Sequence, residues 1–165
     1  MRLVSVPYSV GWNNISGDGA EQLAKVVLEH TSLTDFCCIP LVSLRENSIT
    51  DLNLFGKGVG VPGAIVLSSL LPSAMALKAL NLRENNLDAE AARHLGEGLK
   101  INGSLRELNV TGNALKAEGA RHIADMLAVN QTLTSVDLRY NGQGAALDDA
   151  AKEQLRSAAG DRVKL

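Results

Sequence analysis

The chain has 165 residues, of which 45% are hydrophobic and 21% are charged. A chain of this length predicts one domain with a substantial core and leaves too little room for two full domains. Lys and Arg total 16 against 18 Asp and Glu, which gives a net charge of −2. This balance excludes the electrostatic footprint of a nucleic-acid-binding protein, and no basic cluster indicates binding to a membrane surface.

The start of the chain, MRLVSVPYSVGW, contains one Arg and a short apolar run that Pro7 interrupts, too little for a secretory signal peptide. The two cysteines, Cys37 and Cys38, are adjacent, and a disulfide between neighbouring residues closes almost no loop. We therefore expect reduced thiols and a cytoplasmic location.

One sequence pattern recurs along nearly the whole chain. LKALNLRENNL begins at Leu77, LRELNVTGNAL at Leu105 and LTSVDLRYNGQ at Leu133, each 28 residues after the last. SVPYSVGWNNI and ITDLNLFGKGV fit the same frame, and the shorter unit LTDFCCIPLVSLRENS, of 16 residues, lies just before the latter. The sequence predicts six units in a single domain, residues 1–165. They begin near residues 5, 33, 49, 77, 105 and 133, and each is named below by its first residue.

Each full unit is predicted to form a strand followed by a helix. At the fourth and sixth positions, apolar residues such as Leu80 and Leu82 alternate with polar ones, as in a strand buried on one face. Helical spacing follows in residues 19–30, 63–74 and 119–130, and again in the 77 unit. Because one unit cannot bury its own apolar face, stacked units predict a curved solenoid with a parallel sheet on its inner side.

The frame LxxLxLxxNxL at this spacing resembles the leucine-rich repeat family, specifically its ribonuclease-inhibitor-like subclass. The resemblance implies an α/β horseshoe arc with a concave parallel β-sheet and convex α-helices. Near the C-terminus, Val163 and Leu165 are expected in a short capping strand within residues 161–165. The 5 unit begins almost at Met1 without a polar cap, so we expect a longer parent chain, a truncated product or a partner that shields this end.

Four units carry an asparagine at the ninth position: Asn13, Asn85, Asn113 and Asn141. The resemblance implies a structural ladder in which each amide satisfies backbone groups at the bend after the strand, groups that would cost about 1–3 kcal/mol each if buried unpaired. Leu41 and Lys57 replace asparagine in the 33 and 49 units, and the 33 unit has no room for a full helix. An irregular segment is therefore expected within residues 39–58.

The 49 unit also raises a cofactor-binding alternative. Gly58, Gly60 and Gly63 have the GxGxxG spacing of dinucleotide-binding loops, and Glu84 follows about where a ribose-binding acid would stand. However, the predicted strands alternate, whereas strands of a doubly wound fold are continuously apolar. Pro62 also removes a backbone donor that a pyrophosphate would use. We therefore expect no cofactor.

Residues 58–77 carry no charge, which raises the alternative of a membrane span, but the prolines, glycines and serines among them argue against it. The helix predicted here has Ile65 and Val66 where other units have charged or polar residues. Two interpretations are open. The helix leans into the space left by the missing helix of the 33 unit, or this apolar convex patch contacts a partner or a second copy of the chain.

No catalytic constellation is visible in the sequence. His94 and His122 share a repeat position, but neighbouring helices lie about 8–10 Å apart, too far for two imidazoles to share a zinc ion at about 2.0–2.1 Å. We therefore expect no metal site and no enzymatic activity.

The seventh and eighth positions of the units are predicted to face solvent on the concave side, and three of the five aromatic residues fall there. Exposed aromatic and Arg side chains on a rigid surface are typical of protein-recognition hot spots, although strand faces also favour aromatics. We predict an interaction scaffold that binds another protein through its concave face, or, as the resemblance also allows, a regulatory segment of a larger protein, like GTPase-activating or innate-sensing members. The candidate residues are Trp12, Phe55, Arg83, Glu84, Arg139 and Tyr140.

Overall fold

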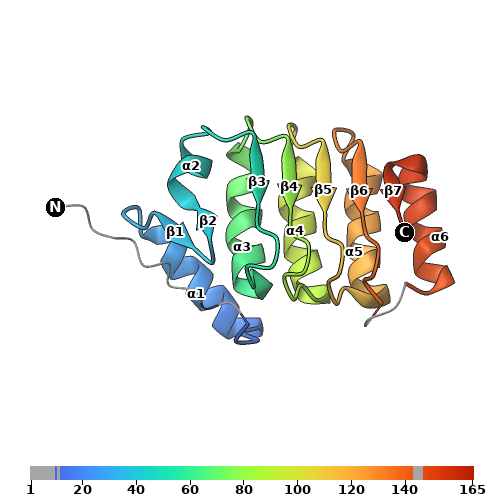
Figure 1. Cartoon of the computed structure of the whole chain (residues 1–165), viewed down its shortest axis with the longest axis horizontal. Coiled ribbons are helices and arrows are strands. Elements are labelled where there is room, and N and C mark those ends of the chain that lie inside the picture. Colours follow the sequence, from blue (N-terminus) through green and yellow to red (C-terminus); the bar gives the residue numbers. More distant parts are fainter. Residues whose placement is uncertain (1–9, 11, 143–146) are drawn as a thin grey trace.

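The computed structural model describes residues 10, 12–142 and 147–165 as a row of parallel strands backed by helices (Figure 1). The strands are β1 (Asp35–Phe36), β2 (Ile39–Pro40), β3 (Asp51–Asn53), β4 (Ala79–Asn81), β5 (Glu107–Asn109), β6 (Ser135–Asp137) and β7 (Val163–Lys164). The helices are α1 (Gly17–Glu29), α2 (Leu41–Arg45), α3 (Gly60–Leu70), α4 (Ala89–Ile101), α5 (Lys116–Val129) and α6 (Asp149–Ala159), with short 3₁₀ turns η1 (Leu71–Ser73) and η2 (Gly160–Arg162).

Five strands form one parallel sheet in chain order, from β3 to β7. Leu52, Leu80, Leu108 and Val136 are aligned across the first four strands and are all buried. Because aligned residues are 28 positions apart, the strand register reproduces the sequence repeat. Helices α3 to α6 pack side by side behind the sheet. The predicted α/β solenoid is confirmed, and β7, which contains Val163, is the expected last strand.

Asn113 shows how the ninth-position amide joins successive units. Its Oδ1 accepts hydrogen bonds from the backbone N–H groups of Asn85 (2.9 Å) and Leu87 (3.0 Å) in the preceding unit. Its Nδ2 donates to the carbonyls of Leu82 (3.0 Å) and Val110 (2.8 Å). Because Asn113 is only 6% exposed, water could not reach these groups to replace the four hydrogen bonds.

The other ninth-position residues follow this pattern to different extents. Asn85 makes corresponding bonds, three to the 49 unit and one to Arg83 O in its own unit, so the predicted ladder is present there. Asn141 donates to the carbonyls of Val110 and Leu138, but its buried Oδ1 has no hydrogen-bond partner among the described residues. Asn13 is exposed and donates to Val10 O within its own bend.

A second amide ladder, which the sequence reasoning missed, lies at the helix-to-strand turns. Asn130 Nδ2 donates to Leu99 O at 2.7 Å, and its Oδ1 accepts from Leu133 N at 2.8 Å. Asn102 makes the equivalent bonds one unit earlier, and both side chains are buried. The sequence signal that could have revealed this ladder is an asparagine at the same position of two successive units, Asn102 and Asn130.

Arg162 ends this second ladder at the C-terminal side. Its guanidinium donates to Leu127 O (3.0 Å), Asn130 O (2.9 Å) and Leu133 O (3.3 Å), carbonyls of the preceding helix end and turn. The planar fork satisfies several carbonyls at once, which a single amide would not do.

Replacement of this guanidinium is expected to loosen the C-terminal end. Arg162→Ala should lower the free energy of unfolding by about 1–2 kcal/mol, because partly buried carbonyls lose a charged donor. Arg162→Lys should recover less than half of the loss, since an ammonium lacks the fork geometry. Urea unfolding measures both, and Arg156→Ala, at an exposed position of α6, serves as control. Full recovery by lysine would show that charge alone matters.

The short 33 unit does not contribute a strand to the parallel sheet. Instead β1 and β2 form a separate antiparallel hairpin whose two-residue turn is Cys37-Cys38, with left-handed φ values of 47° and 62°. The single-turn α2 follows directly. Strand β3 then joins the sheet in regular register, so the expected irregular segment, 39–58, is right for residues 39–48 and wrong from β3 onward. Irregularity falls within residues 33–48, because a unit of this length cannot supply both a strand and a covering helix.

Helix α1 covers the helix that was predicted to carry an apolar convex patch. It packs against α3, with Leu28 beside Ile65, and Val66 is fully buried. Two carboxylate oxygens of Glu90, in α4, accept from the N–H of Gly17 at the start of α1 (3.0 and 3.2 Å). The interpretation of an exposed Ile65 and Val66 contact patch is therefore wrong for Val66, and Ile65 is half-buried. Helix α3 is apolar all round because other elements cover both sides.

Candidate functional site

The concave face of the sheet has a hollow of about 410 Å³. Its floor consists of the third and fifth residues of successive units, which point away from the core because side chains alternate along a strand. The sequence reasoning placed the exposed columns at the seventh and eighth positions and overlooked this floor, although the polar residues between core leucines were the signal. The floor residues are Asp51, Asn53, Ala79, Asn81, Glu107, Asn109, Ser135, Asp137 and Lys164.

Phe55, Arg83 and Glu84 form a compact group beside this floor. The Arg83 guanidinium lies 5.2 Å from the centre of the Phe55 ring, within the range of a cation–π contact. Glu84 Oε1 accepts hydrogen bonds from Arg83 Nε (3.0 Å) and Nη2 (2.8 Å). All three side chains are exposed. The structure thus brings together three of the predicted recognition residues on neighbouring units.

Arg139 and Asp137 form a second group near the C-terminal end of the sheet. Arg139 Nε and Nη2 donate to the two carboxylate oxygens at 2.9 and 2.6 Å. Partial burial raises the pKa of Asp137, but hydrogen bonds from Arg139 outweigh it, so the net pKa lies below the usual range. The same hydrogen bond raises the pKa of Arg139. Both groups are therefore charged at neutral pH.

The eighth position of each full unit has a left-handed backbone. Gly56 and Gly112 have φ values of 64° and 68°, but Trp12 (67°), Glu84 (54°) and Tyr140 (59°) adopt the same conformation with a side chain. A left-handed backbone costs a residue with a Cβ roughly 1–2 kcal/mol. Trp12 and Tyr140 nevertheless stand there with 61% and 63% of their surface exposed. Two bulky aromatics thus occupy strained positions from which they project into solvent.

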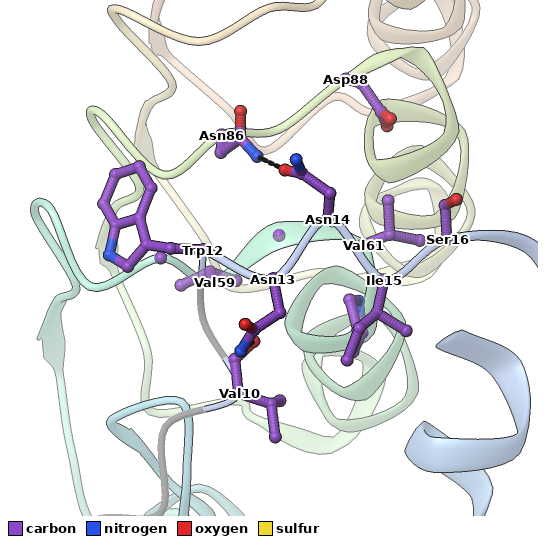
Figure 2. A pocket seen from close by; sticks show the side chains of 13 residues that line it. Val10, Trp12, Asn13, Asn14, Ile15, Ser16, Val59, Val61, Asn86 and Asp88 are labelled. Atoms are coloured by element: carbon purple, nitrogen blue, oxygen red, sulfur yellow. Dashed lines mark hydrogen bonds between the residues drawn. The ribbon is translucent and has the colours of Figure 1, made fainter. Parts of the chain in front are cut away.

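Trp12 lies on the strand-to-helix turns rather than on the sheet floor. Figure 2 shows the segment that carries it, with Asn14 bonded to Asn86. This segment lines a pocket of about 230 Å³ together with residues 58–62. A Cβ on Gly58 would meet the Trp12 indole at 2.6 Å, so the glycine admits the ring.

The three glycines of the GxGxxG spacing serve the repeat. Gly58 lies under the Trp12 ring, and a Cβ on Gly63 would collide with Val59. The amides that a phosphate would need are already used. Lys57 N and Val59 N donate to Asn85 Oδ1, and Gly60 N donates to Asn85 O. This loop therefore does not present the free N–H groups of a dinucleotide site.

Within the described ranges, no three His, Cys, Asp or Glu residues are placed to hold a metal ion. His94 is bonded to its neighbour, with Arg93 Nη2 2.8 Å from its Nε2. Burial lowers the pKa of His94, and the Arg93 charge lowers it further. The described residues also contain no helix of the length and apolarity needed to cross a bilayer.

Comparisons with known proteins agree with this architecture. A family model described as "Leucine Rich repeat" matches residues 102–124 and 129–142. The chain is similar to the solved structure of "Leiomodin-1 Actin-Binding Site 2 (ABS2)", with a TM-score of 0.65 and 20% identity over 72% of this chain and 69% of that chain. It is also similar to the tropomodulin C-terminal domain from Caenorhabditis elegans, with a TM-score of 0.62 and 21% identity over 72% of each chain. No curated protein matches the sequence. Both structural similarities are similarities of fold.

Proposed function

We propose that this leucine-rich repeat protein is a non-enzymatic scaffold that binds another protein through the concave sheet and its rim. The 28-residue register supports a place in the ribonuclease-inhibitor-like subclass. The observation that carries the proposal is the placement of Trp12 and Tyr140 in left-handed, exposed positions where two of the other three full units have glycine. Backbone strain of this kind persists where the side chain serves a function.

The rigidity of the face adds to this argument. Backbone hydrogen bonds, two amide ladders and a continuous core fix the strands before any partner arrives. A preformed surface loses little conformational entropy on binding, so a few aromatic and Arg contacts supply useful affinity. Phe55, 46% exposed with Arg83 across its ring, is the third aromatic anchor.

The proposal is tested by capture from a lysate of the source cell. One bait is the unaltered protein, and the other carries Trp12→Gly, Phe55→Ala and Tyr140→Gly. Glycine is chosen because Gly56 and Gly112 show that it suits the eighth position, so the variant should fold within about 1 kcal/mol of the parent. We expect proteins that the unaltered bait retains to be depleted at least about tenfold on the variant, as the loss of hot-spot residues predicts. Purified actin is assayed alongside, since one structural neighbour is titled an actin-binding site.

A convex variant controls for nonspecific apolar adhesion. Ile101 and Val129, at the ends of α4 and α5, are 72% and 61% exposed. Ile101→Ala with Val129→Ala removes exposed apolar side chains from the helical side of the molecule and should retain the partner. Equal recovery on all three baits, or loss only on the convex variant, would contradict the proposed concave binding.

A further inference from the structure

Most charges on the concave face are already neutralised by a neighbour. Arg83 is paired with Glu84 at 2.8 Å, and Arg139 with Asp137 at 2.6 Å. Two floor carboxylates remain without a cation among the described residues. Asp51 accepts only from the Thr50 hydroxyl at 2.6 Å, and Glu107 makes no hydrogen bond or ion pair there. The uncompensated charge in the first half of the hollow is therefore negative.

These two carboxylates flank a small residue. Asp51, Ala79 and Glu107 are aligned on β3, β4 and β5. Neighbouring strands lie about 4.8 Å apart, so the two acidic residues stand roughly 10 Å apart, with a single methyl group between them. The floor is consequently lowest over Ala79, and a side chain that descends there meets a carboxylate on each side.

The next row of the floor presents hydrogen-bond donors. Asn53 Oδ1 accepts from Phe55 N at 3.1 Å, and Asn109 Oδ1 accepts from Thr111 N at 2.9 Å. With the oxygens turned to the backbone, the Nδ2 groups of Asn53 and Asn109 donate no hydrogen bond within the described part of the chain. Amide N–H groups beside the carboxylates suit the carbonyl oxygens of a peptide backbone.

We propose that the concave floor receives an extended basic segment of the partner protein, with one Arg or Lys side chain over Ala79 between Asp51 and Glu107. This inference rests on the proposed function and adds the chemistry of the partner. Two flanking carboxylates favour arginine, whose planar group presents donors along both edges. Lys164, on β7 at the other end of the hollow, lies three strands or about 14 Å from Ala79 and orients the segment by attracting an acidic residue.

Synthetic peptide libraries test this directly. The immobilised protein is offered X5-Arg-X5, X5-Gln-X5 and X5-Glu-X5 libraries with blocked termini, in which X is any uncharged residue. At low salt we expect the Arg library to be retained at least about fivefold above the Gln library, and the Glu library least. Raising the ionic strength should narrow the difference, because exposed charges are screened.

Substitutions that neutralise carboxylates on the floor, compared with substitutions of carboxylates elsewhere, show which carboxylates cause the preference for Arg. Asp51→Asn with Glu107→Gln should abolish the preference for Arg while leaving the fold intact, whereas Glu118→Gln with Asp125→Asn, at exposed acids of α5, should not change it. Glu107→Lys should shift the preference toward the Glu library. Equal retention of the Arg and Gln libraries by the unaltered protein, no retention of either, or an Arg preference that survives Asp51→Asn with Glu107→Gln would overturn the inference.

The capture experiment separates this inference from the proposed function. If the variant with Trp12→Gly, Phe55→Ala and Tyr140→Gly loses the cellular partner while the Asp51→Asn, Glu107→Gln variant keeps it, concave binding stands and the basic-segment inference fails. If both of these variants keep the partner, both proposals fail.

Discussion

Asn113→Ala is expected to destabilise the protein by about 3–5 kcal/mol. The substitution leaves the N–H groups of Asn85 and Leu87 and the carbonyl of Leu82 without their partner inside a buried bend, whereas the carbonyl of Val110 keeps its bond from Asn141. Each group that loses its partner costs about 1–3 kcal/mol. A loss of this size is a large fraction of the stability of a typical domain. In a chain of this length it corresponds to a fall in melting temperature of roughly 10 °C. Thermal and urea unfolding followed by circular dichroism measure it.

Asn13→Ala is the matched control, because Asn13 has the same repeat position but is exposed. Its removal should cost less than about 1 kcal/mol, since water replaces an exposed partner. Equal costs at the two positions would mean that the amide acts only within its own bend, and the ladder between units would then have no energetic role.

The repeat made most of this fold predictable. A period of 28 residues fixes the strand register, because aligned leucines must share one core, and it places each helix behind its strand. The ninth-position asparagines were predictable for the same reason, as every repeated bend poses the same hydrogen-bonding problem. The exposed state of Phe55, Arg83 and Tyr140 also follows from the frame.

Features that break the repeat were not predictable from it. The 33 unit has apolar residues at the same core positions as its neighbours. Ile39, at the seventh position, is nevertheless buried within a hairpin instead of facing solvent on the concave side. The path of α1 across α3 depends on Glu90, from a unit 72 residues further along than the one containing Gly17. Such contacts between distant units carry no periodic signal. The floor carboxylates were not predicted for another reason, since the aromatic columns beside them carry the stronger sequence signal.

Gly98→Ala is expected to destabilise the protein by about 2–3 kcal/mol, although alanine in a helix is more favourable than glycine by up to about 1 kcal/mol. Gly98 lies in α4 directly against the backbone of Ser68 in α3. An added Cβ would stand 2.7 Å from the Cα of Ser68 and would also collide with the Ser68 carbonyl oxygen. Both atoms are backbone, so no rotamer change relieves the overlap and the two helices must separate. The urea midpoint measures the loss.

Gly19→Ala supplies the comparison, because it makes the same change in a helix without a neighbouring backbone. Gly19 is exposed near the start of α1, and its added Cβ would meet only Ile15 Cγ2 at 3.7 Å, an ordinary contact. The variant should therefore gain roughly 0.5–1 kcal/mol from helix propensity. Opposite signs for these two identical substitutions would assign the Gly98 loss to the α3–α4 contact. A gain at both positions would show that the helices separate at no cost, so close packing between units would not be what sets the spacing of the solenoid.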